Sequence, residues 1–351
     1  MAEIVLDAVA KAFGTTVAVD GIDLTVADGE FVVLFGPTGA GKTTTLRLVA
    51  GLEKADRGRV LIGGTDVTAM PPAARNVAFV FQQYSLYPHY TVYDNMAFPL
   101  RAPGQKLAKA DIDRRVREIA ALLRIESKLG NRATALSGGE MQLVAIGRAL
   151  VRSPTVFLMD EPLSSLDAKL REDLRVELKR IQRDLGATVL YVTHDQLEAM
   201  TLADRIGVLS EGRLVQIGTP RDVYETPENV YVARRLGSPA INLLDPAVLD
   251  VGAVPSAAAE VGIRPEDVLL NPDAGVEAAV LAVEHLGVET VLLLDADGHH
   301  VHALLGASAP VRQGERIKIG ARAGAALFFD TEGRRIPAPP AGQAKEAAYG
   351  T

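Results

Sequence analysis

Residues 36–44 read Gly36-Pro37-Thr38-Gly39-Ala40-Gly41-Lys42-Thr43-Thr44, and this stretch decides the fold of the chain. It follows an apolar run, Phe31–Phe35, that predicts a buried strand, and it begins a helix that we expect to reach Ala50. Glycines let backbone N–H groups turn inward around phosphate oxygens, and the N-terminus of a helix adds a favourable dipole. We therefore predict a phosphate-binding loop, in which Lys42 neutralises β- and γ-phosphates and Thr43 ligates Mg²⁺.

A second apolar run, Thr155–Met159, predicts another buried strand, and two carboxylates follow it, Asp160 and Glu161. A buried strand that carries acids to its end is unfavourable unless a cation or a substrate binds there. We expect Asp160 to orient the Mg²⁺ shell through a water molecule, and Glu161 to polarise an attacking water. An apolar run ending in Asp-Glu is ambiguous alone, but together with the phosphate loop it predicts ATP hydrolysis.

Composition is that of a globular protein with two domains. The chain has 351 residues, of which 48% are apolar and 23% charged, and its net charge is -7. That charge lies in residues 236–351, which hold 8 basic and 15 acidic side chains, so the first 235 residues balance at 29 of each sign. Neither part has the basic surface of a nucleic-acid-binding protein, and we expect no nucleic-acid partner.

Cysteine and membrane signals are absent from the sequence. Without cysteine there are no disulfides and no thiolate metal sites, which fits a reducing compartment. The first ten residues lack a cationic start and an apolar core, and no apolar run approaches the ~20 residues of a membrane span. We expect a cytoplasmic protein that reaches a membrane by docking on a partner.

Between the two motifs lies Leu136-Ser137-Gly138-Gly139-Glu140. Ser137 and the two glycine amides head a predicted helix, which makes a second anion-binding helix start, although a single ATPase domain needs one such site. With this segment the sequence resembles ABC-transporter ATPase subunits over nearly the whole chain, and residues 137–139 look like the signature loop of that family. The resemblance implies a head-to-tail dimer, in which each signature caps the γ-phosphate of ATP held by the partner's phosphate loop.

The remaining family elements follow in order along the chain. Gln82 matches the Q-loop glutamine, which touches Mg²⁺ and senses the transmembrane partner. Ser164-Ser165-Leu166-Asp167 matches the D-loop at the dimer seam, and it is also typical of a capped helix start. His194 matches the switch histidine that holds the γ-phosphate and the water. Phe13 matches the aromatic ring that stacks on adenine, although a core phenylalanine fits the same pattern.

Loops outside these motifs resemble the carbohydrate-importing members, such as the maltose, sugar and glycerol-3-phosphate importers: Ser85–Val92, Ile217–Pro220, Gly237–Pro239 and Val261–Val268. The resemblance implies uptake of a sugar, polyol or sugar phosphate through two permease subunits, with an extracellular or periplasmic solute-binding protein acting indirectly. The chain would then lie on the cytoplasmic face of the inner or plasma membrane. The second ATPase subunit is either another copy or a related chain.

Other functions stay open at this stage. Iron, polyamine and sulfate importers carry similar C-terminal segments, so the solute is less certain than the family. A non-transport ABC ATPase that acts on DNA or ribosomes is a second alternative, which the importer-like tail disfavours. A regulatory module that hydrolyses ATP poorly is a third, which Glu161 and His194 disfavour.

The resemblance also predicts the architecture. We expect an α/β fold: a P-loop ABC ATPase domain with a parallel-sheet core at residues 1–235, including a helical subdomain at about 85–152. A smaller all-β, OB-like regulatory domain follows at 236–335, and a flexible tail at 336–351. His299, His300 and His302 beside the turn Asp297-Gly298 predict a hairpin tip rather than a metal site.

The signature loop departs from the family at its end. Glutamine and then basic residues usually follow the two glycines, whereas this chain has Glu140 and Met141. A carboxylate near a partner's triphosphate would repel it unless the carboxylate pointed away.

Overall fold

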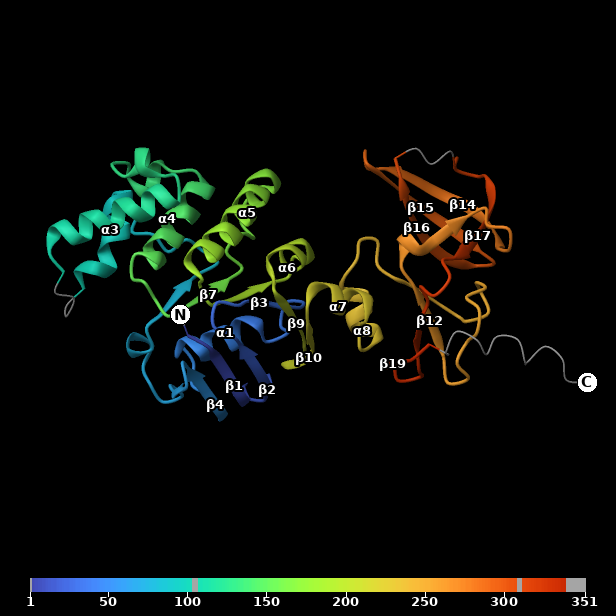
Figure 1. The fold of residues 1–351 in the computed structure, drawn as a ribbon, viewed down its shortest axis with the longest axis horizontal. Helices are drawn as coiled ribbons and strands as arrows, with labels where there is room; N and C mark the ends of the chain where they lie inside the picture. Colours follow the sequence, from blue (N-terminus) through green and yellow to red (C-terminus); the bar gives the residue numbers. More distant parts are fainter. Residues whose placement is uncertain (1, 103–106, 308–310, 339–351) are drawn as a thin grey trace, which may run out of the picture. The chain divides into compact units, whose positions relative to one another are not determined.

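The computed structural model describes residues 2–102, 107–307 and 311–338 (Figure 1). The chain forms two compact units, one that ends at Pro220 and one that begins at Arg221. The first unit contains the phosphate loop and all of the other predicted ATPase motifs.

A six-stranded sheet in the order β10-β9-β3-β8-β7-β6 forms the centre of the first unit. Its strands are β3 (Phe31–Phe35), β6 (Val77–Val80), β7 (Val156–Asp160), β8 (Val189–Thr193), β9 (Arg205–Ser210) and β10 (Arg213–Gly218). All pairs are parallel except that of the edge strand β10. Every residue of β3, β7 and β8 is buried, as expected for strands covered on both faces. The predicted parallel core is confirmed.

A second, antiparallel sheet was not predicted from the sequence. It has the order β2-β1-β4-β5 and contains β1 (Ile4–Phe13), β2 (Thr16–Val26), β4 (Arg57–Ile62) and β5 (Thr65–Asp66). Buried and exposed positions alternate along β2, because one face of this sheet is open to solvent. Its apolar face shares a single core with helix α1 (Lys42–Ala50) and the parallel sheet, so α1 is enclosed by both sheets.

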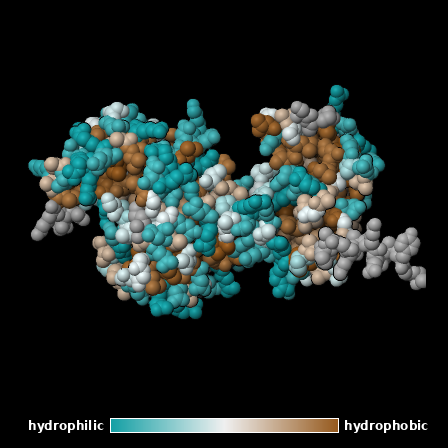
Figure 2. Space-filling model, viewed as in Figure 1, coloured by the Kyte–Doolittle hydropathy of each residue, from teal (hydrophilic) through white to brown (hydrophobic). Residues whose placement is uncertain are grey.

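Helices between β6 and β7 occupy the interval of the predicted helical subdomain. They are α2 (Val92–Ala97), α3 (Lys109–Leu122) and α4 (Gly138–Leu150), with the 3₁₀ turns η2 (Phe98–Arg101), η3 (Glu126–Lys128) and η4 (Ala133–Ala135). Another 3₁₀ turn, η1 (Pro72–Ala74), precedes β6. Figure 2 shows hydrophobic side chains gathered over α3 and α4, with hydrophilic ones around them.

Two more helices cover the parallel sheet, α5 (Ala168–Leu185) and α6 (Gln196–Leu202). Asp167 caps α5, because its side chain accepts from the Leu170 N–H at 3.0 Å, so the predicted capped start is confirmed. Gly186 ends α5 in the left-handed conformation, at a φ of 58°.

The second unit is the predicted OB-like domain. It begins with α7 (Pro220–Glu225, whose first residue belongs to the first unit) and α8 (Val230–Arg235). One antiparallel sheet contains β11 (Asn242–Leu244), β12 (Glu260–Ile263), β18 (Leu327–Phe329) and β19 (Arg335–Ile336). The other contains β13 (Val268–Leu270), β17 (Arg316–Ala321), β14 (Val276–His285), β15 (Glu289–Ala296) and β16 (His299–Gly306), with η5 (Pro265–Asp267) before β13. Both sheets contribute to one apolar core, in a barrel-like arrangement.

The histidines behave as predicted for a hairpin. His299 pairs with Ala296 and His300 with Asp295, so both lie at the start of the returning strand β16, directly after the turn Asp297-Gly298.

The units divide earlier in the chain than the predicted boundary after residue 235. Arg264, almost fully buried, lies 3.8 Å above the Tyr224 ring and donates to the carbonyls of Tyr224, Ala233 and Leu236. Helices α7 and α8 are therefore anchored to the β domain. Most of the predicted tail at 336–351 lies outside the described residues, which end at 338.

Candidate functional site

The phosphate loop connects the end of β3 to the start of α1, as predicted for Gly36 to Thr44. Gly39 and Gly41 have φ angles of 83° and 97°, in the left-handed region that favours glycine. A Cβ on Gly41 would lie 2.4 Å from the Ala18 carbonyl oxygen, and one on Gly36 would lie 2.6 Å from that of Leu209. The loop is thus held close to β2 and β9 by backbone approaches that other residues would block.

Lys42 is buried at the centre of the loop, with 5% of its surface exposed. Its ammonium donates to the carbonyl oxygens of Gly36 and Pro37, each at 2.9 Å, and lies 3.8 Å from Glu161 Oε1. Burial lowers the pKa of Lys42, and the carboxylates of Glu161 and Asp160 oppose that shift. The result is a fixed, nearly dehydrated cation surrounded by oxygen atoms.

Asp160 and Thr43 form the second contact of the site. The Thr43 hydroxyl donates to Asp160 Oδ1 at 2.8 Å, and Asp160 is 9% exposed. Burial raises the pKa of Asp160, although the hydrogen bond from Thr43 acts in the opposite direction. A hydroxyl and a carboxylate side by side are the oxygen ligands that Mg²⁺ prefers, so these residues fit that ion.

Glu161 and His194 form the third contact. Glu161 Oε2 lies 2.9 Å from His194 Nδ1, which brings together residues that follow β7 and β8. The backbone of Glu161 has a φ of 43°, an unfavourable conformation for this residue type, and its N–H donates to the Val192 carbonyl. Strained backbone of this kind is often found at functional sites.

Ser164 links Gln82 to this cluster, and the sequence did not indicate that role. The Ser164 hydroxyl donates to the Glu161 carbonyl at 3.0 Å and accepts from Gln82 Nε2 at 3.3 Å. Ser164 lies in the segment that resembles a D-loop, but no local pattern shows which side chain its hydroxyl meets. Gln82 is therefore joined to Glu161 through one intervening side chain.

The signature residues lie at the N-terminus of α4. Ser137 caps the helix, and its Oγ accepts from the Glu140 N–H at 3.3 Å. Within the part of the chain that the structure describes, no hydrogen bond or ion pair joins Ser137, Gly138 or Gly139 to residues 36–44. Among the described residues, Lys42 and His194 are thus joined through Glu161, while no such bond joins the signature to the phosphate loop.

Phe13 lies at the end of β1 and is 48% exposed, so it is not a core phenylalanine. The ammonium of Lys11 lies 5.3 Å from the centre of its ring and pairs with Asp56 at 3.0 Å. An exposed ring held from one side by a cation has its other face available for stacking.

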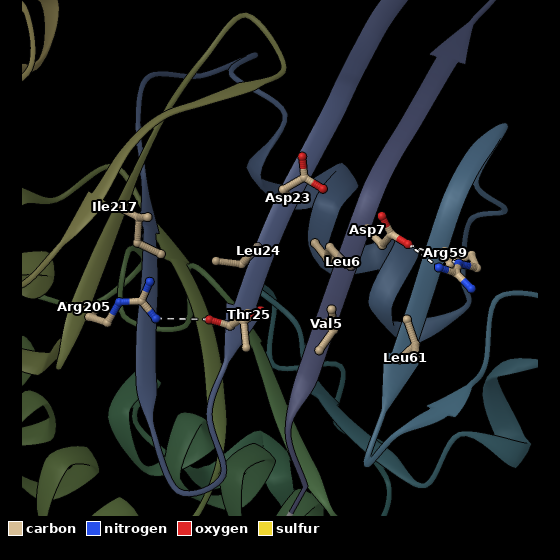
Figure 3. Close-up of a pocket in the computed structure, with 10 residues that line it drawn as sticks. All are labelled: Val5, Leu6, Asp7, Asp23, Leu24, Thr25, Arg59, Leu61, Arg205 and Ile217. Atoms are coloured by element: carbon tan, nitrogen blue, oxygen red, sulfur yellow. Dashed lines mark hydrogen bonds and ion pairs between the residues drawn. The ribbon is translucent and has the colours of Figure 1, made fainter.

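A hollow of 490 Å³ lies over the solvent-facing side of the antiparallel sheet (Figure 3). Its arginines are already paired: Arg59 with Asp7 at 2.6 Å, and Arg205 with Glu30 at 3.4 Å and the Thr25 carbonyl at 3.2 Å. The remaining charged side chain, Asp23, accepts from the Ala8 N–H at 2.8 Å. Residues 36–44, Asp160 and Glu161 do not line it, so this hollow is separate from the phosphate loop.

Known proteins match this chain over most of its length. The sequence pattern described as "ABC transporter" matches residues 19–164, and that of the "TOBE domain" matches residues 261–329. The "sn-glycerol-3-phosphate import ATP-binding protein UgpC 2" of Rhizobium johnstonii is 48% identical over 328 residues, or 90% of this chain and 94% of the relative. The chain belongs to the ABC transporter family.

Further relatives agree with this assignment. The "Trehalose/maltose import ATP-binding protein MalK" of Thermococcus litoralis is 45% identical, over 91% of this chain and 95% of the relative. Among solved structures, the dimeric ATP-binding cassette MJ0796 with ADP and phosphate is 31% identical and covers 62% of this chain and 99% of its own, with a TM-score of 0.56. This ABC transporter subunit is an ATPase, and the predicted fold class, with its OB-like C-terminal domain, is confirmed.

The buried carboxylate gives a first prediction. Because burial raises the pKa of Asp160 above its unfolded value of about 3.9, its contribution to stability is present below that pH and is lost as pH rises through the folded-state pKa. Asp160→Asn keeps an acceptor for Thr43 and removes the buried charge. Without nucleotide or metal, we expect Asp160→Asn to have a higher melting temperature than the wild type at pH 7. The difference in melting temperature should shrink towards pH 4.

Calorimetric scans between pH 4 and pH 8 measure this difference. Asp173→Asn, which removes a charge from an exposed position on α5, is the matched control and should melt with the wild type at each pH. Parallel pH profiles for the Asp160→Asn variant and the wild type would show that the carboxylate is not destabilised by burial.

Proposed function

We propose that this ATPase powers the import of a sugar, polyol or sugar phosphate through two permease subunits. The observation that carries the proposal is the 48% identity to a glycerol-3-phosphate import ATP-binding protein, over 90% of this chain and 94% of the relative. A trehalose/maltose import protein is similar over a comparable length. Importer proteins for two kinds of carbohydrate-related solute are therefore similar to this chain across both of its units. Importers of polyamines, iron or inorganic anions remain the alternative.

The same side chains support a mechanism of ATP hydrolysis. We assign Lys42 and the amides of Gly39 to Thr44 to the phosphates of ATP, because the buried ammonium and the helix start favour anions. Thr43, Asp160 and Gln82 would hold Mg²⁺, with Asp160 acting through a water molecule. That ion supplies positive charge to the phosphate oxygens. Phe13 would stack on adenine through its open face.

Glu161 is our candidate for the general base. Its carboxylate is fixed from two directions, by Lys42 at 3.8 Å and by His194 at 2.9 Å, so its lone pairs are oriented before the reaction. As a water oxygen bonds to the γ-phosphorus and the bond to the β-phosphate oxygen breaks, Glu161 takes the water proton. His194, at the exposed side of Glu161, would hold the water and the γ-phosphate in line.

The separated signature residues support a composite site. Ser137, Gly138 and Gly139 form an anion-binding helix start that this chain does not bring to its own phosphate loop. A head-to-tail pair of ATPase subunits would join each signature to the partner's ATP, as the resemblance implies. The similar bacterial ABC transporter cassette MJ0796 has been solved as a dimer, which supports such a pair. The second subunit is another copy of this chain or a related one.

An apolar surface beside Gln82 is our candidate for the permease contact. Leu86 lines a hollow of 410 Å³ with Pro88 and Met141, and Tyr87 lines another of 330 Å³ with Phe98. The rings of Tyr87 and Phe98 lie 4.6 Å apart, and both are exposed. Exposed aromatic clusters of this kind mark protein interfaces.

No helix in the described ranges is long and apolar enough to cross a bilayer. Attachment through this surface would place the subunit at the cytoplasmic face of the membrane.

The second prediction tests the assigned chemistry. Glu161→Gln keeps the size of the side chain but removes the base, so ATP should still bind while turnover falls by about 100-fold or more. Lys42→Ala should instead weaken nucleotide binding, because it removes the buried cation. Steady-state phosphate release and a fluorescent-nucleotide titration distinguish the two effects. Turnover near that of the wild type in Glu161→Gln would overturn the assignment of the base.

The third prediction tests coupling and the solute. Leu86→Ala with Tyr87→Ala removes one apolar side chain from each hollow, so it should abolish transport while the ATPase activity of the isolated subunit stays within about twofold. The measurement is uptake of labelled glycerol 3-phosphate and maltose by proteoliposomes that contain this subunit, its permeases and the solute-binding protein.

Val176→Ala with Leu185→Ala, which removes exposed apolar side chains from α5, is the matched control and should leave uptake intact. Full transport by the Leu86/Tyr87 variant would move the permease contact elsewhere. Uptake of polyamine, iron or sulfate in place of both carbohydrate substrates would refute the proposed solute class.

A further inference from the structure

Glu140, the departure from the usual signature, is turned back onto its own helix. It is the third residue of α4, and its Oε2 accepts from the Ser137 N–H at 2.9 Å. In return, Ser137 Oγ accepts from the Glu140 N–H, which completes a capping box. This arrangement fixes the Ser137 backbone and directs the carboxylate to the start of the helix.

Two amide groups at this helix start remain for an anion. The first four N–H groups of a helix lack partners within it. Here, counted from the cap, the Ser137 N–H donates to Glu140 Oε2 and the Glu140 N–H donates to Ser137 Oγ, which leaves those of Gly138 and Gly139. The carboxylate of Glu140 therefore lies within one turn of the groups that would meet a phosphate, where its charge would oppose binding.

Lys128 pairs with the other carboxylate oxygen. Its ammonium lies 2.9 Å from Glu140 Oε1, and it comes from η3, outside the signature segment. The hydrogen bond from Lys128 is the largest cause that lowers the pKa of Glu140, followed by the one from the Ser137 N–H, so the carboxylate is ionised at neutral pH. The two side chains are 41% and 28% exposed, and an ion pair this exposed adds little to folding stability.

We propose that Lys128 is a positioning residue for the signature loop: it holds the Glu140 carboxylate against the Ser137 N–H and cancels its charge beside the partner's triphosphate. This inference rests on the composite site proposed above. It explains how the chain carries a carboxylate where the family usually has an amide. Without Lys128, an uncompensated negative charge would stand next to the Gly138 and Gly139 amides, and ATP would bind less tightly in the composite site.

A double-mutant cycle tests the proposal. Lys128→Met keeps the length of the side chain and removes its charge, so we expect the KM for ATP of the purified dimer to rise about three- to tenfold. In the Glu140→Gln background, the same Lys128→Met change should leave the KM unaltered, because no carboxylate remains to compensate. The rise in KM should also shrink between about 0.05 and 0.5 M salt, since screening shortens the reach of the exposed charge.

Arg117→Met is the matched control, because it breaks an exposed ion pair of equal length, with Asp113 at 2.9 Å on α3. It should leave the KM unchanged. Gly138→Asp, which adds a carboxylate at the first residue of α4, reports on the composite site itself and should raise the KM.

The outcomes separate the two hypotheses. If Gly138→Asp raises the KM while Lys128→Met does not, the composite site stands and the role of Lys128 is refuted. If Lys128→Met raises the KM equally with Glu140 and with glutamine at that position, Lys128 acts through structure and the proposal is also refuted. If neither Gly138→Asp nor Lys128→Met changes the KM while Lys42→Ala still weakens binding, the composite site itself is wrong.

Discussion

Burial of the Lys42 ammonium is the constraint on which the rest of the site depends. A buried cation needs oxygen atoms around it, and this one has the carbonyls of Gly36 and Pro37 and the carboxylate of Glu161. The carbonyls are available because the loop bends back at left-handed glycines. The carboxylate is available because β7, which ends just before Glu161, pairs with β8, and β8 lies beside β3, from which the loop begins. Loop conformation and strand order thus serve the same contact.

The two sheets then have distinct roles. The parallel sheet brings Asp160, Glu161 and His194 to one edge, because the carboxyl ends of its strands meet there. The antiparallel sheet encloses α1 from the other side and provides the Ala18 carbonyl against which Gly41 packs. It also ends β1 at Phe13, which leaves that ring exposed near the start of the chain. The phosphate loop is thus packed against the antiparallel sheet, while the proposed adenine contact lies at the end of β1.

Features set by neighbouring residues could be predicted from the sequence, whereas features set by contacts between distant residues could not. The loop at residues 36–44, the strand ending at Asp160 and the capped start of α5 are local patterns, and all three were predicted correctly. The antiparallel sheet was missed: β1 and β2 form a local hairpin, in which Phe13 pairs with Thr16, but the pairing of β1 with β4 joins distant residues such as Ile4 and Ile62. The compact units divide after Pro220 rather than after residue 235, and Arg264 hydrogen-bonds back to Tyr224 across 40 residues, a contact that no local pattern indicates.

Side-chain contacts within the site also could not be predicted from the sequence. No spacing indicates that Ser164 joins Gln82 to Glu161, or that Lys128 meets Glu140, because both contacts depend on how separate turns pack. The sequence showed the unusual carboxylate at position 140, but it did not show that this carboxylate turns towards the Ser137 N–H and Lys128.

The central claim is that ATP lies between the phosphate loop of one subunit and the signature of another. Because the chain has no cysteine, single cysteines can be introduced at two exposed positions, Thr38→Cys in one preparation and Ser137→Cys in another, both with Glu161→Gln to retain ATP. The measurement is the formation of covalent dimer by a short bis-maleimide cross-linker, which adds one cysteine thiol at each end. A head-to-tail homodimer predicts cross-linked dimer in the mixture of the two preparations, dependent on ATP, and none in either preparation alone. Cross-linking of the Ser137→Cys chains to each other, or no cross-link in the mixture with ATP, would contradict it.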